Sequence, residues 1–136
     1  WKRYTKGKVE QMIKSENMII FKKENEAIGT EKISDQPTSF YNAQDKKNWE
    51  NSKANALYFT ALAISPKYHG MGYGSVLLDF VENYAKENRM DYLRMTMFFK
   101  NKPLANYYIQ KGFTFQQKRK VRELDLILSF CEKRLN

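Results

Sequence analysis

The chain is poor in the residues that build disulfides and metal centres. Its 136 residues include one cysteine, Cys131, and one histidine, His69. A single cysteine excludes an internal disulfide framework and a multi-cysteine zinc site, and a single histidine excludes a multi-histidine cluster. We therefore expect no bound metal. We expect Cys131 to be a buried, apolar residue, because its surroundings are strand-like.

Long apolar runs are also missing. No stretch approaches the roughly 20 apolar residues of a transmembrane helix, and no signal peptide is visible. The first residue is Trp1 and not methionine, so we expect that sequence upstream is missing. The length predicts a single domain over residues 1–136 with a sizeable core, and we expect it to be cytoplasmic.

Charge of one sign dominates the chain, with a formal net charge of +9 at pH 7. Such a basic chain raises the possibility of nucleic-acid binding. The basic residues are spread out, however, and the densest group, residues 118–120 with Arg122, is shorter than a basic arm. Solvated lysines and attraction for a polyanionic cofactor explain the charge better, so we expect neither a nucleic-acid nor a membrane partner.

Hydrophobic periodicity predicts alternating helices and strands, and therefore an α/β (α+β) fold. A long polar loop at 35–55, with a helical turn around 45–50, separates the N-terminal hairpin from the rest. The predicted helices span residues 8–15, 75–87 and 102–111, and the predicted strands span 18–23, 27–34, 56–64, 92–99, 113–117 and 124–131.

Residues 69–74 read His-Gly-Met-Gly-Tyr-Gly and lie between a predicted strand and a predicted helix. A glycine-rich turn that opens a helix directs backbone N–H groups and the positive end of the helix dipole at one point, which favours a phosphate. Glycine permits close approach and positive φ. The spacing matches neither a Walker loop, which needs a lysine before Ser75, nor a dinucleotide G-x-G-x-x-G fingerprint.

Two segments resemble motifs of the GNAT family of N-acetyltransferases. Residues 61–66 (ALAISP), followed by residues 69–75 (HGMGYGS), resemble the acetyl-CoA motif of that family, R/Q-x-x-G-x-G/A after a strand end. Farther along, Asn101, Tyr108 and the pair Gly112-Phe113 match the register of the family's downstream motif, although Leu104 stands where alanine is usual.

The resemblance implies a GNAT fold over residues 56–113, with a mixed central sheet and flanking helices. Two neighbouring parallel strands, 56–64 and 92–99, would splay apart to admit the pantetheine arm of acetyl-CoA. The first strand and helix of the family fold have no counterpart, so the chain is expected to be short at its N-terminus.

The resemblance also implies the site residues. Tyr108 would be the general acid that donates to the leaving thiolate. Asn101 would bind the cofactor, cap the helix, or do both, and His69 takes the position that is usually Arg or Gln. The expected cofactor-binding residues are Leu62, Ala63, Ile64, His69, Gly70, Met71, Gly72, Tyr73, Gly74, Ser75 and Asn101.

The general base stays open at this stage. The predicted central strands offer no carboxylate, only side chains such as Tyr58 and Arg94. Loop acids (Asp35, Asp45 and Glu50), ordered waters or an amine of low pKa remain as alternatives.

The expected reaction is acetyl transfer from acetyl-CoA to a primary amine of a small molecule or peptide, by direct attack in a ternary complex. The loop at 35–55, with Phe40, Tyr41 and Trp49, would contact the acceptor. The alternative is a non-catalytic module that binds CoA or a nucleotide for regulation. A homodimer is left open as the assembly.

Overall fold

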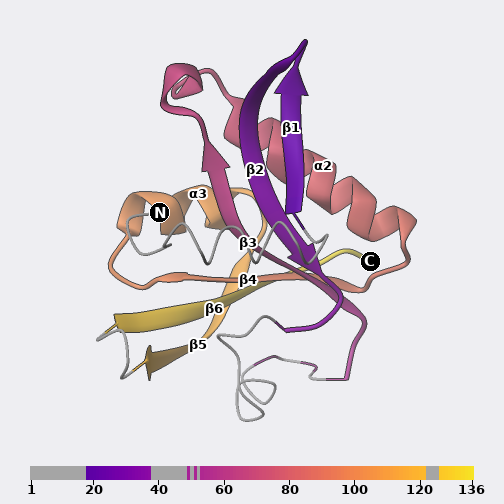
Figure 1. Cartoon of the computed structure of the whole chain (residues 1–136). Coiled ribbons are helices and arrows are strands. Elements are labelled where there is room, and N and C mark those ends of the chain that lie inside the picture. The colour runs from indigo at the N-terminus through magenta and orange to yellow at the C-terminus, as the bar shows by residue number, and fades with distance from the viewer. Residues whose placement is uncertain (1–17, 38–48, 50, 52, 122–125) are drawn as a thin grey trace.

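A computed structural model describes residues 18–37, 49, 51, 53–121 and 126–136. These residues form one mixed six-stranded sheet in the order β1-β2-β3-β4-β6-β5 (Figure 1). The elements are β1 (Met18–Lys23), β2 (Glu26–Ser34), β3 (Ala56–Ile64), a 3-10 turn η2 (Pro66–Tyr68), α2 (Tyr73–Glu87), β4 (Tyr92–Phe98), α3 (Lys102–Gln110), β5 (Thr114–Val121) and β6 (Leu126–Arg134).

Both helices cover the same face of the sheet, where the main core lies (Figure 1). Helix α2 buries residues at helical spacing, including Leu78, Val81 and Ala85, and leaves its charged residues outside. Strand β4 turns Leu93, Met95 and Met97 toward the same core, as the alternation in the sequence predicts. Cys131 is fully buried in this core, so its predicted burial is confirmed.

A second cluster lies on the opposite face of the sheet. Trp49, from the polar loop, is 4 % exposed and packs edge-on against Tyr58 and Phe130. The guanidinium of Arg94 lies over its ring, 5.0 Å from the centroid. The sequence placed Trp49 among the acceptor contacts, but its ring is instead part of the packing beneath the sheet.

The sheet opens between β3 and β4. These parallel strands pair only at Ala56–Tyr58 with Tyr92–Arg94, although each continues well beyond that point. On its other side, β3 pairs with β2 across an irregularity between Thr30 and Lys32. There Ala61 takes a positive φ of 57°, which inserts an extra residue into β3. The splayed strand pair that the resemblance implied is therefore present.

The predicted boundaries of the last two strands were wrong. Strand β5 continues through the basic group at 118–120, beyond its predicted end at 117, because an edge strand can pair while its charged side chains stay in water. Strand β6 reaches Arg134, beyond the predicted end at 131, because Glu132, Lys133 and Arg134 pair with β4.

Helix α2 begins at Tyr73, two residues before the predicted start, since Gly72 acts as its N-cap in the left-handed region. The predicted helix at 8–15 and the turn at 45–50 lie outside the described residues. Within the described ranges, no helix is long and apolar enough to cross a membrane.

Candidate active site

The glycine turn between β3 and α2 has the backbone conformation that its sequence predicts. Gly70 and Gly72 have φ angles of 75° and 82°, a region that side-chain-bearing residues rarely adopt. Gly72 caps α2 through its backbone, and no side chain caps this end of the helix. The first turn of α2 contains no acidic residue. The helix N-terminus therefore keeps its positive potential for an anion.

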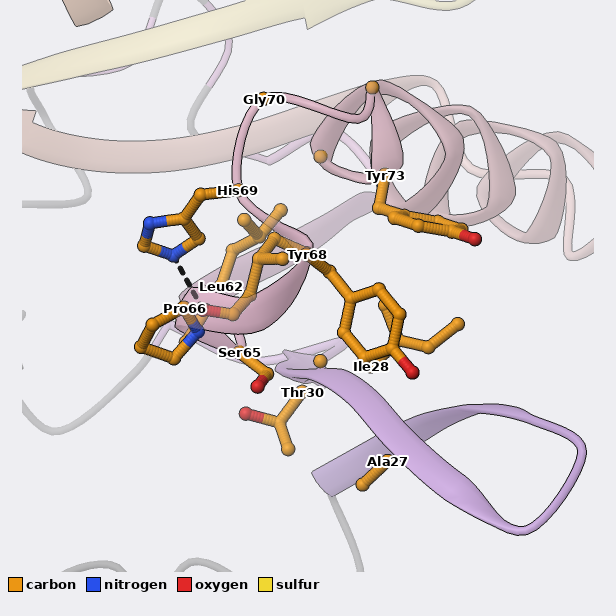
Figure 2. A pocket seen from close by; sticks show the side chains of 15 residues that line it. Ala27, Ile28, Thr30, Leu62, Ser65, Pro66, Tyr68, His69, Gly70 and Tyr73 are labelled. Carbon is orange, nitrogen blue, oxygen red and sulfur yellow. Dashed lines mark hydrogen bonds between the residues drawn. The ribbon is translucent and has the colours of Figure 1, made fainter.

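Room for a ligand lies directly over these glycines. A Cβ atom built on Gly70, Gly72 or Gly74 would meet no other atom within 4 Å. The turn forms one wall of a cavity of about 750 Å³, a volume typical of small-molecule sites (Figure 2). Most of the predicted cofactor residues line it, namely Leu62, Ala63, Ile64, His69, Gly70, Gly72, Tyr73 and Gly74. Met71, Ser75 and Asn101 do not.

His69 holds the turn against the end of β3. Its ring Nε2 lies 2.8 Å from the carbonyl oxygen of Ile64, as Figure 2 shows. Since a carbonyl can only accept, Nε2 carries the proton and donates it. This leaves Nδ1 as the nitrogen available to a ligand. The imidazole thus shapes the turn, a role that its position in the motif did not reveal.

The β1–β2 hairpin is tied to the same turn. The N–H of Ser65 donates to the carbonyl of Ile28 at 2.7 Å. The Tyr68 hydroxyl donates to the Glu26 carboxylate at 2.6 Å, and the Lys67 ammonium donates to it at 2.9 Å. The hydrogen bond from Tyr68, followed by that from Lys67, lowers the pKa of Glu26. These contacts position β2 as the second wall of the cavity.

Tyr108 lies at the point where β3 and β4 separate, not on the cavity wall. Its ring packs against Phe59 of β3 and Phe113, with centroid distances of 6.3 and 5.3 Å. It is 6 % exposed. Burial raises the pKa of the phenol above its usual value of 10, and the nearby Glu31 carboxylate adds to the shift. The phenol is therefore protonated throughout the physiological range.

Tyr107, beside it, faces a different partner. Its hydroxyl and the Ser75 hydroxyl lie 2.9 Å apart, which joins α3 to the first turn of α2. Asn101 caps α3, because its Oδ1 accepts from the N–H of Leu104 at 3.3 Å. Gly112 follows the C-cap of the helix with a φ of 89°. The downstream motif thus serves first to build and orient α3.

Comparison with known proteins now identifies the family. The model of the acetyltransferase (GNAT) family matches residues 2–115. The chain belongs to the GNAT acetyltransferase family. No curated protein matches it significantly.

Solved structures agree with this GNAT assignment at the level of the fold. A GNAT acetyltransferase from Listeria monocytogenes superposes with a TM-score of 0.75 at 20 % identity, covering 93 % of this chain and 69 % of that one. A GNAT acetyltransferase from Elizabethkingia anophelis with acetyl-CoA bound gives 0.72 at 19 %, covering 96 % and 84 %. Ard1 from Thermoplasma volcanium gives 0.72 at 14 %, covering 98 % and 81 %.

Of the loop acids named as candidate bases, one lies within the described residues. Asp35 is exposed at the end of β2, and Asp45 and Glu50 lie outside the described residues. The sequence missed Glu31, which is completely buried on β2 and acts electrostatically on Tyr108. Strand alternation could have found it, since Gly29, Glu31 and Ile33 share one face with the core. Within the described ranges, no cluster of His, Cys, Asp and Glu could hold a metal.

Proposed function

We propose that this acetyltransferase transfers the acetyl group of acetyl-CoA to a primary amine of a small molecule or peptide, by direct attack in a ternary complex. The observation that carries the proposal is the open glycine turn at the N-terminus of α2, beside the gap between β3 and β4. The glycine turn suits the pyrophosphate of the cosubstrate, and the gap between the strands suits its extended, amide-bearing pantetheine arm. The solved structure from Elizabethkingia anophelis holds acetyl-CoA, which supports this choice of cosubstrate.

In this proposal, the backbone amides from Gly70 to Ser75 hold the pyrophosphate, as helix N-termini do for many phosphates. Met71 is 64 % exposed, and Tyr73 lines the cavity. Both act mainly through their N–H groups. The backbone from Leu62 to Ile64 runs alongside the pantetheine arm. A Cβ on any of the three glycines would enter the space left for the ligand.

Tyr108 donates a hydrogen bond to the leaving sulfur. A thiol has a pKa of about 8.5 and a free tyrosine about 10, so complete proton transfer is uphill by roughly 2 kcal/mol even before burial acts. Burial raises the pKa of Tyr108 further. A hydrogen bond that strengthens as negative charge develops on sulfur is therefore its contribution, while the proton stays on the phenol.

Asn101 contributes by holding α3. Its side chain is already engaged with the N–H of Leu104, so a direct bond to the cofactor is secondary. The loop at 35–55 supplies part of the contacts of the acceptor amine.

The proposal is tested by thiol release from acetyl-CoA with a panel of primary amines. We expect turnover with at least one amine and none without an acceptor. Thermal melts provide the binding test, since a ligand at 100 times its Kd stabilises the folded state by about 2.7 kcal/mol. Equal stabilisation by ATP and acetyl-CoA would show that only the anion half of the site exists.

A further inference from the structure

Glu31 is a buried carboxylic acid on β2, on the face that α2 and α3 cover. Two residues earlier, a Cβ built on Gly29 would lie 2.9 Å from Ile64 Cδ1 and 3.2 Å from Leu77 Cδ2. Two residues later, Ile33 packs on the main core. Because side chains two apart on a strand share a face, the carboxyl group points into apolar surroundings between these contacts.

The Glu31 carboxyl group is buried without a hydrogen bond to offset the cost of its burial. It is 0 % exposed, and neither of its oxygens has a hydrogen-bond partner in the described part of the chain. Burying such a group without a partner costs free energy, and native proteins rarely tolerate it without a reason. Burial raises the pKa of Glu31 from 4.5 to about 8.

Its position relates it to the reacting end of the site. The pairs that flank it on the ladder, Thr30 with Ala63 and Lys32 with Thr60, enclose the irregularity at Ala61. This irregularity lies just beyond the last paired residues of β3 and β4. Gly29, two residues earlier on the same face of β2, lines the cavity. Glu31 therefore adjoins the gap through which the thioester would reach Tyr108.

The groups around this gap are almost all neutral or apolar. Glu31 is the second-largest cause of the raised pKa of Tyr108, after burial, and Tyr107 and Cys131 follow it. Burial raises the pKa of the Cys131 thiol to about 12. The facing residues of α2, such as Leu77 and Leu78, are apolar. Burial is the cause of the raised pKa of Glu31, and no cation of the described residues counters it, so the carboxyl group can gain and lose a proton.

We propose that Glu31 is the general base of this enzyme, which accepts the proton that the acceptor ammonium must lose before attack. This inference rests on the proposed function and assigns the base that the function needs. The carboxylate takes the proton directly or through one water in the gap. It starts ionised and becomes neutral, and the neutral form is the one that its apolar surroundings favour.

The proton balance is complete without another reactant. The ammonium gives one proton to Glu31, and the free amine attacks the acetyl carbon, forming the C–N bond. The C–S bond then breaks, and the thiolate leaves with its electron pair, hydrogen-bonded by Tyr108. The second proton of the attacking nitrogen goes to the thiolate through water, and Glu31 releases its proton to solvent for the next cycle.

The test compares wild type with Glu31→Gln, using one alkylamine and one arylamine across pH 6–10. With the alkylamine, we expect kcat/KM of the variant to fall on the order of 10²-fold, and its acidic limb near pH 8 to vanish. With the arylamine, which is unprotonated at these pH values and needs no base, we expect a change of less than about threefold. Glu31→Asp keeps the base with a shorter reach and should recover part of the alkylamine activity.

Asp79→Asn is the control, because Asp79 is an exposed carboxylate on α2. Equal losses with both amines would make Glu31 structural, and an unchanged pH profile would remove its role. If the wild type is active, either result overturns the role of Glu31 and leaves the proposed function standing. A wild type that releases no thiol with any amine overturns the proposed function, and this inference with it. Melts with acetyl-CoA check that the variant still folds and binds.

Discussion

Among the residues that the structure describes, two glutamate side chains are almost completely buried, and their surroundings are opposite. Glu132 on β6 is 1 % exposed, and its Oε2 accepts from Arg94 Nε at 2.9 Å. Glu31 on β2 is 0 % exposed and has no hydrogen-bond partner among the residues that the structure describes. The two carboxyl groups lie in one sheet, yet only the first has a counter-charge.

The Arg94–Glu132 pair is also held from other directions. The Arg94 guanidinium donates to the Tyr58 hydroxyl at 3.2 Å and to the backbone carbonyl of Asn51. It lies over the ring of Tyr92, 4.9 Å from the centroid. A charge with this many partners fastens the loop residues to the sheet.

The difference between the two carboxyl groups distinguishes a structural role from a role in proton transfer. A charge that serves the fold is neutralised where it is buried, because an unpaired charge in an apolar interior is costly. A carboxyl group that is buried without a partner has its pKa raised toward neutrality, which suits proton transfer. We therefore expect changes in the Arg94–Glu132 pair to lower stability, and changes around Glu31 and Tyr108 to lower the rate of the reaction.

The largest expected effect is a loss of stability when the Arg94–Glu132 ion pair is broken. Glu132→Gln leaves the Arg94 charge buried and uncompensated, so we expect a loss of about 3–5 kcal/mol in the free energy of unfolding. Urea denaturation measures it. Glu82→Gln is the control, because the salt bridges of Glu82 to Lys86 and Lys133 are partly exposed and should be worth less than about 1 kcal/mol. The double variant R94M/E132L should recover much of the loss, and a failure to do so would mean that packing, not charge, is at stake.

The next effect is kinetic. Tyr108→Phe keeps the ring contacts with Phe59 and Phe113 but removes the donor to the leaving thiolate. We expect kcat to fall on the order of 10²-fold, about 2.7 kcal/mol, with little change in acetyl-CoA affinity. Tyr84→Phe, on the exposed side of α2, is the matched control. Full activity in Tyr108→Phe would place Tyr108 with Arg94 among the purely structural residues.

Replacing the unpaired Glu31 should raise stability, whereas replacing the paired Glu132 lowers it. The pKa of Glu31 is about 8 in the folded state and near 4.5 in the unfolded chain. Its contribution to stability is therefore fully present below pH 4.5 and is lost as the pH rises to about 8. We expect Glu31→Gln to exceed wild type by roughly 2 kcal/mol at pH 8, because the amide that replaces the carboxyl still lacks a partner. Melting curves at pH 5 and pH 8 measure the difference, and an advantage that does not grow with pH would contradict it.

A smaller effect is expected at the glycine turn. Gly74→Val places a side chain in the space left for the ligand without straining the backbone, since Gly74 lacks the positive φ of its two neighbours. We expect acetyl-CoA to bind at least about tenfold more weakly, or roughly 1.4 kcal/mol. Asn83→Val, at an exposed position of the same helix, controls for helix propensity. Calorimetric titration decides, and normal affinity would mean that the turn does not hold the pyrophosphate.

The smallest effect should come from Tyr107→Phe. It removes the hydrogen bond to Ser75, worth about 1 kcal/mol, and so loosens the link between α3 and the glycine turn. We expect about a fivefold increase in the Kd for acetyl-CoA, with kcat nearly unchanged. This pattern is the reverse of the one for Tyr108→Phe, so the neighbouring tyrosines can be separated by kinetics.

The sequence predicted the parts of the site that depend on local physics. The glycines at 70 and 72 have positive φ, as the turn requires, and the apolar spacing of α2 sets its buried face. The register from Asn101 to Gly112 predicted the cap and end of α3. The sequence did not predict the ends of β5 and β6. The charged side chains there are typical of a loop, but the backbone pairs with neighbouring strands.

What the sequence by itself determined is the family, the glycine turn and the position of Tyr108, because each depends on residues close together in the chain. Only the tertiary structure decided which charges are paired. Arg94 and Glu132 are 38 residues apart and meet across two strands, while Glu31 has no hydrogen-bond partner among the described residues. A single sequence does not show whether an ion-pair partner from a distant part of the chain will lie beside a buried charge. The free-energy cost of burying the charge depends on that partner.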